Sequence, residues 1–221
     1  YGTLLFWPFS YSRIAWNNIS IIDPIFTIPL LALVITAAIK KRRIFSIMAI
    51  IWVITYLSIG LYQKNEALKT GKSLAKNRGH DFSRIEVKPS IGNLLLWKSI
   101  YETEDKFYID AIRVGWEIKI FNGESINKIN IQSSFPWLEL KSQQAKDIER
   151  FKWFSNGFIA INPNNKDQIL DIRYSSIPNQ VGGLWGIELS KEKANNEHVK
   201  YITSRNISKD RISAIKKMLF N

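Results

Sequence analysis

"IFSIMAIIWVITYLSIGLY", residues 44–62, is the stretch that decides the fold, because it runs for 19 positions without a charged side chain. As an α-helix it would be about 28 Å long, which matches the hydrocarbon core of a bilayer. A buried helix of a soluble protein is usually shorter and apolar on one side only. The stretch therefore predicts a transmembrane helix over residues 44–62.

A second apolar stretch, residues 21–39, precedes the first and contains a single acid, Asp23. Pro24 suits the first turn of a helix, and Asp23 just before it can accept hydrogen bonds from free backbone N–H groups. Two roles for Asp23 stay open: a simple helix cap, or an acid inside the membrane boundary, where acids are functional candidates. The stretch predicts another transmembrane helix over residues 21–39.

The turn between the two apolar stretches is "KKRR", residues 40–43. By the positive-inside rule such a turn lies in the cytoplasm, which places the remainder of the chain on the opposite side of the membrane. The basic residues between positions 64 and 78 argue for the reverse orientation. We expect the extracytoplasmic orientation, because a short turn with four positive charges is the clearest signal that the rule uses.

Charge is distributed unevenly along the chain, which has 221 residues, a net charge of +12 and a mean hydropathy of −0.11. Residues 1–62 contain five of the 31 lysines and arginines and one acid, so residues 63–221 carry 26 basic and 18 acidic side chains, a net charge of +8. Beside two apolar stretches, this excess favours contact with the lipid bilayer and its anionic headgroups, and no nucleic acid partner is expected. The lack of cysteine excludes disulfides and thiolate metal sites.

Four segments follow from these patterns. We expect residues 1–20 to form a loop at the membrane interface and residues 21–62 to contain the two transmembrane helices. Residues 63–79, in which lysines surround a few apolar side chains, predict a basic amphipathic linker helix. Residues 80–221 then form a soluble α+β domain.

Strand and helix patterns alternate within residues 80–221. Alternating apolar residues predict strands at 83–90 and at both sides of a hairpin turn at 102–106. Ser142 predicts the start of a helix that ends near Gly157, and Ser208 the start of a last helix. Other strands are predicted at residues 158–161, 168–174, 183–189 and 199–203.

The predicted fold class is thus a membrane α-helical hairpin followed by an α+β domain with a mainly antiparallel sheet. Bulky aromatic residues on apolar faces usually form the core of such a domain. We expect Trp97, Trp153 and Phe154 in or near this core.

Residues with catalytic chemistry are sparse in the soluble domain. His80 and His198 each stand beside an acid, but neither has another ligand at helical spacing, so both are expected to be surface loop residues. The sequence has no G-x-S-x-G motif and no cysteine nucleophile. These observations favour a non-catalytic scaffold or binding domain with an unidentified protein partner.

The opening of the chain carries a family resemblance. "YGTLLFWPFS", an arginine, an A-W pair and "IIDPIFT" follow one another at tight spacing. This order resembles the bacterial inner-membrane-associated proteins of the YdjM/YbcI type, which are classed as metal-dependent hydrolases. Further similar stretches are residues 94–109, 149–161 and 171–176.

The resemblance implies a multi-pass protein of the bacterial inner membrane and a divalent metal, with zinc as the candidate. In that family the residues assumed to bind the metal precede the "YGT" motif. We therefore expect this chain to be the C-terminal part of a longer hydrolase and to hold no metal by itself. The resemblance makes Asp23 the candidate catalytic residue, and the candidate substrate-binding residues are Tyr1, Gly2, Thr3 and Arg13.

Overall fold

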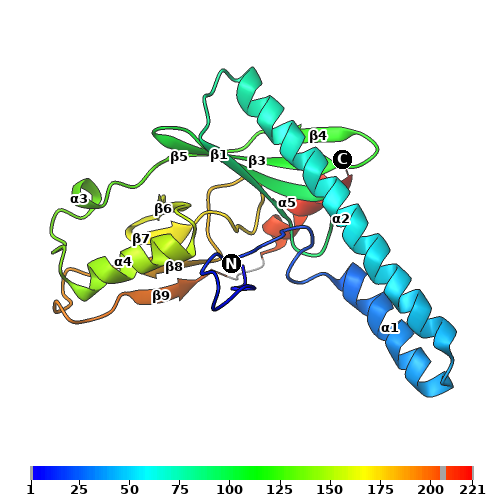
Figure 1. Ribbon diagram of the computed structural model, residues 1–221. Helices are drawn as coiled ribbons and strands as arrows, with labels where there is room; N and C mark the ends of the chain where they lie inside the picture. The colour runs from blue at the N-terminus through cyan, green and yellow to red at the C-terminus, as the bar shows by residue number, and fades with distance from the viewer. Residues whose placement is uncertain (1, 205–207, 221) are drawn as a thin grey trace.

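The computed structural model describes residues 2–204 and 208–220, and it consists of a helical hairpin followed by antiparallel sheets with a few short helices (Figure 1). This architecture confirms the predicted fold class. The helices are α1 (Pro24–Lys40), α2 (Arg43–Asn77), α3 (Ile131–Ser134), α4 (Gln143–Phe154) and α5 (Lys209–Phe220).

The strands form two sheets in which every pairing is antiparallel. The first sheet contains, in spatial order, β1 (Arg84–Pro89), β2 (Leu96–Glu102), β3 (Lys106–Val114) and β4 (Ile118–Phe121), with β5 (Ser125–Asn127) also paired to β3. The second sheet contains β6 (Ile159–Asn162), β7 (Asn165–Asp171), β8 (Trp185–Glu188) and β9 (Lys200–Thr203). Strands next to each other in sequence thus pair in space, as the predicted hairpins require.

Helix α1 begins at Pro24 because Asp23 caps it. The Asp23 backbone is extended, and its carboxylate accepts a hydrogen bond from the Phe26 amide at 3.2 Å. The helix has 17 residues. It begins at Pro24 and ends at Lys40, whereas the predicted span was 21–39. In the described part of the chain, α2 is the one helix long and apolar enough to cross a membrane, and α1 is a shorter apolar helix packed against it.

Helix α2 is continuous over 35 residues, about 50 Å, where the sequence predicted a span at 44–62 and a separate linker helix at 63–79. Its second half is part of the protein core. Ala67 and Ala75 are fully buried, and Ala67 packs with Trp97 and Ile112 of the first sheet. The packed domain therefore extends back into α2, beyond the predicted start at residue 80.

The domain has four layers, which Figure 1 shows from α2 to α4. Helix α2 covers one face of the first sheet. The other face meets the second sheet and α5, and α4 covers the outer face of the second sheet. The core between the two sheets contains Ile100, Phe107, Ile109, Phe158, Ala160, Leu170 and Ile172.

The aromatic prediction is correct for Trp97 and wrong for Trp153 and Phe154. Trp97 has no exposed surface, whereas Trp153 is 61% exposed and Phe154 is 37% exposed. Helix α4 turns Ile148 and Phe151 toward the second sheet instead, because residues three apart share a helix face. Trp153 and Phe154 thus lie at the rim of the domain.

Gly71 sits where α2 meets the first sheet, and a larger residue there has no space. A Cβ added at Gly71 would lie 2.7 Å from Ser99 Oγ and 2.9 Å from Ile85 Cδ1. We expect Gly71→Leu to lower the free energy of unfolding by about 1–3 kcal/mol through overpacking, measured by urea unfolding in detergent micelles. Lys72→Ala, on the exposed side of the same turn, should leave it nearly unchanged. Equal unfolding of both variants would contradict this packing.

Candidate site at the membrane interface

Asp23 is buried between α1 and α2, with 4% of its surface exposed. One carboxylate oxygen caps α1, and the other accepts a hydrogen bond from the Tyr56 hydroxyl at 2.9 Å. The Tyr56 ring packs between those of Phe26 and Trp52, with centroids 5.3 and 5.4 Å away. The carboxylate is therefore held by a helix end and by a phenol.

The position of Tyr56 shows where Asp23 lies along α2. Tyr56 lies within the uncharged stretch of α2 and seven residues before Gln63, a distance of about 10 Å along the helix. Asp23 is thus the cap of α1, the first of the two roles left open by the sequence, and it lies opposite the apolar part of α2.

Residues 2–20, which we call the aromatic loop, bring three of the predicted substrate-binding residues together. Thr3 and Ile14 exchange two backbone hydrogen bonds of 2.9 Å. Gly2 has a φ of 80°, and a Cβ there would approach Arg13 Cβ to 3.1 Å. Gly2, Thr3 and Arg13 are therefore neighbours, whereas Tyr1 lies outside the described residues.

Arg13 reaches away from Asp23, toward the C-terminal end of α4. Its Nη2 donates to the carbonyl oxygens of Trp153 at 3.1 Å and Phe154 at 3.4 Å. The guanidinium carbon also lies 4.0 Å from the centroid of the Trp153 ring. A cation at the last carbonyls of a helix is favourable, and a cation–π contact adds to it. The structure thus places Arg13 and Asp23 at different contacts.

The aromatic loop is attached to α2 as well. Lys64 Nζ donates to the Trp16 carbonyl at 2.6 Å, and a Cβ at Gly60 would lie only 2.3 Å from the Asn18 oxygen. Just after the loop, the Gly92 amide, between β1 and β2, donates to the Ile22 carbonyl at 3.0 Å. The loop is therefore held against α2 and against the C-terminal end of α4.

Large apolar side chains of the aromatic loop point outward. Phe9 is 95% exposed. Such a concentration of exposed aromatic surface is unusual in a soluble protein and typical of a membrane interface. The other strongly exposed members are Leu5, Phe6, Trp7, Tyr11 and Trp16.

The residues near Asp23 do not fit a closed metal site. Within residues 2–204 and 208–220, no three His, Asp or Glu side chains are grouped closely enough to hold a metal ion. His80 is half-buried, with Nδ1 2.7 Å from the Tyr101 hydroxyl. His198 is exposed, as predicted, and its Nδ1 lies 2.9 Å from Asp147 Oδ2.

Sequence reasoning identified Asp23 and missed its partner. Tyr56 lies within the apolar stretch of residues 44–62, and a hairpin pairing of residues 33 positions apart has no local signal. Lys64 carried a usable signal, because it is the first charge after the apolar stretch and such lysines reach back to the interface.

The bond between Tyr56 and Asp23 makes a prediction about stability. Tyr56→Phe leaves a buried carboxylate oxygen without its donor, which costs about 1–3 kcal/mol. We expect the variant to unfold at a lower temperature in detergent micelles, followed by tryptophan fluorescence. Tyr62→Phe, at an exposed tyrosine of the same helix, is the matched control. If the two variants melt alike, the hydrogen bond does not hold the hairpin.

Comparison with known proteins concerns this same region. Residues 1–67 match the family described as "YdjM inner membrane protein". The match covers the aromatic loop, α1 and α2 as far as residue 67, so the similar stretches expected between residues 94 and 176 lie outside it. No curated protein and no solved structure matches the chain. The chain is thus similar to an inner-membrane family in the part that contains its long apolar helix.

Proposed function

We propose that this chain anchors an α+β domain in the bacterial inner membrane and fixes its orientation on the bilayer surface. The observation that carries the proposal is the continuity of α2, whose first half is apolar and whose second half packs one face against the first sheet. A rigid helix shared by membrane and domain leaves no flexible linker between them. The domain then works as a scaffold that presents a surface at constant height.

In this proposal both helices of the hairpin cross or enter the membrane. Helix α1 is about 26 Å long, and its N-terminal end lies level with the apolar part of α2 through Asp23. The preceding residues Ile21 and Ile22 are 77% and 65% exposed, which suits immersion in lipid. With the basic turn in the cytoplasm, the domain is extracytoplasmic.

The aromatic loop lies in the headgroup region in this arrangement. Trp and Tyr side chains are favoured there because their rings are apolar and their edges are polar. The loop is held at the level of Gly60 and Lys64, where the charged part of α2 begins. The net charge of +8 on residues 63–221 adds attraction to anionic lipids.

A second candidate is a metal-dependent hydrolase, favoured by the match of residues 1–67 and by the burial of Asp23. Because the described residues do not assemble a metal site, this candidate requires further ligands from outside this chain. Asp23 would then contribute a carboxylate beside the metal, and the aromatic loop with Gly2, Thr3 and Arg13 would contact the substrate.

Single-cysteine variants test the orientation cleanly, because the chain contains no cysteine. We expect Gln132→Cys on α3, on the side of the domain away from α1 and α2 in Figure 1, to react with a membrane-impermeant maleimide applied outside the inner membrane of intact spheroplasts. Lys41→Cys, in the turn of the hairpin, should react only after lysis. The reverse pattern would place the domain in the cytoplasm.

The depth of the aromatic loop has its own test. A nitroxide attached to Phe9→Cys in vesicles should be relaxed by lipid-soluble oxygen more than by a water-soluble nickel complex. A nitroxide at Gln132→Cys should show the opposite preference. Equal behaviour of both labels would remove the loop from the membrane interface.

A further inference from the structure

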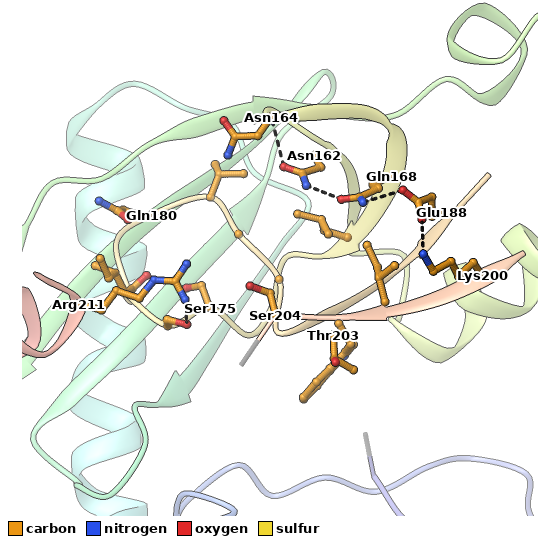
Figure 2. Close-up of a pocket in the computed structure, with 18 residues that line it drawn as sticks. Asn162, Asn164, Gln168, Ser175, Gln180, Glu188, Lys200, Thr203, Ser204 and Arg211 are labelled. Atoms are coloured by element: carbon orange, nitrogen blue, oxygen red, sulfur yellow. Dashed lines mark hydrogen bonds and ion pairs between the residues drawn. The ribbon is translucent and has the colours of Figure 1, made fainter. Parts of the chain in front are cut away.

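A polar cavity of about 520 Å³ opens between the second sheet and the loop that follows β7. Figure 2 shows Asn162, Gln168 and Glu188 along the sheet side and Ser175, Gln180 and Arg211 at the other end. Amide and hydroxyl groups dominate its wall. A cavity of this size and chemistry can accept a small polar molecule.

Lys98 of β2 ends at this cavity from the interior side. Only 4% of Lys98 is exposed, and its Nζ contacts two neutral groups, Ser175 Oγ at 2.7 Å and the Gln180 carbonyl at 3.1 Å. Ser175 and Gln180 both line the cavity. A buried amine is thus in hydrogen-bond contact with the hydroxyl of a residue that lines the cavity.

The charges around Lys98 do not neutralise it by direct contact. Burial lowers the pKa of Lys98 to about 7, and the carboxylates of Asp171 and Glu124 oppose this effect only in part. Lys88 stands opposite Lys98 on β1, and it forms its own ion pair with Glu86 at 3.1 Å. Near neutral pH, a large fraction of the Lys98 side chains is therefore neutral, with a free electron pair on Nζ.

Arg173 completes the charged surroundings and is paired elsewhere. Its guanidinium binds the buried carboxylate of Asp171, with Nη2 2.7 Å from Oδ2. Because this pair is internal, Asp171 does not form the close contact with Lys98 that would hold the amine protonated.

We propose that Ser175 and Lys98 form a nucleophile and general-base pair that cleaves small polar carboxylic esters or amides bound in this cavity. The distance between Ser175 Oγ and Lys98 Nζ, 2.7 Å, lies within the range that proton transfer requires. The site is independent of the membrane anchor and of any metal. It needs no residue of the aromatic loop.

The chemistry balances with the groups present. When Lys98 is charged, Ser175 accepts from it and donates to the Ile177 carbonyl at 2.7 Å. When Lys98 is neutral, it takes the proton of Ser175 as Oγ bonds to the substrate carbonyl carbon. The bond to the leaving alcohol or amine then breaks, and that group leaves with the proton from Lys98. Water adds to the acyl-serine and gives its proton to Lys98. The bond between Ser175 Oγ and the acyl carbon then breaks, Lys98 returns the proton to Oγ, and the acid is released.

Gly182, in the same loop, lies beside Ser175. A Cβ added at Gly182 would lie 3.6 Å from Ser175 Cβ. The loop backbone therefore passes close to the nucleophile. The many amides and hydroxyls of the wall suit a substrate with several polar groups.

A fluorophosphonate probe tests the pair without knowledge of the natural substrate, because it modifies activated serines. In the full chain in detergent micelles, we expect covalent labelling at Ser175, located by peptide mass spectrometry. The rate should rise about tenfold or more between pH 6 and pH 8, as Lys98 loses its proton. Lys98→Met, which keeps an apolar stem in the same space, should lower the rate about 100-fold or more.

Ser73→Ala, which removes an exposed hydroxyl on α2 outside the cavity, is the matched control and should keep the wild-type rate. Labelling that is absent from Ser175 in the folded wild-type chain would overturn the proposal. A rate independent of pH would do the same, and this measurement needs no variant that folds. A folded Lys98→Met variant that labels at the wild-type rate would reduce Lys98 to a packing residue.

Discussion

The fold depends on α2, one helix whose first half exposes apolar side chains and whose second half packs against the first sheet. Over its first 20 residues, α2 exposes apolar side chains, which is favourable only in lipid or against another apolar surface. Over its last turns it presents Ala67, Gly71 and Ala75, whose small side chains let the first sheet approach closely. A bend between the two parts would separate the sheet from the bilayer, and the helix has no proline to produce one.

The aromatic loop reinforces this arrangement by its contact with the C-terminal end of α4. The Phe154 carbonyl at the end of α4 accepts hydrogen bonds from Arg13 of the loop and from Arg173 of the domain interior. Arg173 in turn binds Asp171 at the end of β7. A chain of charged hydrogen bonds thus runs from the aromatic loop to the polar interior between the sheets.

Sequence patterns predicted the structural features that depend on contacts between residues close together in the chain. The Asp23 and Ser142 caps, the hairpin turn at residues 102–106 and the apolar stretch of α2 all follow from spacing and residue type. The partners that complete the sites come from afar: Tyr56 for Asp23, and Ser175, 77 positions from Lys98. No periodicity encodes such pairs. The third strand of residues 94–121, β4, was missed because the bend at Gly115 interrupts the pattern.

Three basic side chains, those of Lys88, Lys98 and Arg173, lie in the interior between the sheets, and two of them form ion pairs. Glu86 neutralises Lys88, and Asp171 neutralises Arg173, in ion pairs of 3.1 and 2.7 Å. Lys98 has only neutral hydrogen-bond acceptors at contact distance. Burying its charged form there costs free energy. A methionine or leucine at this position would avoid that cost. The neutral amine of Lys98 is the feature that such a residue lacks, and the proposed reaction with Ser175 depends on it.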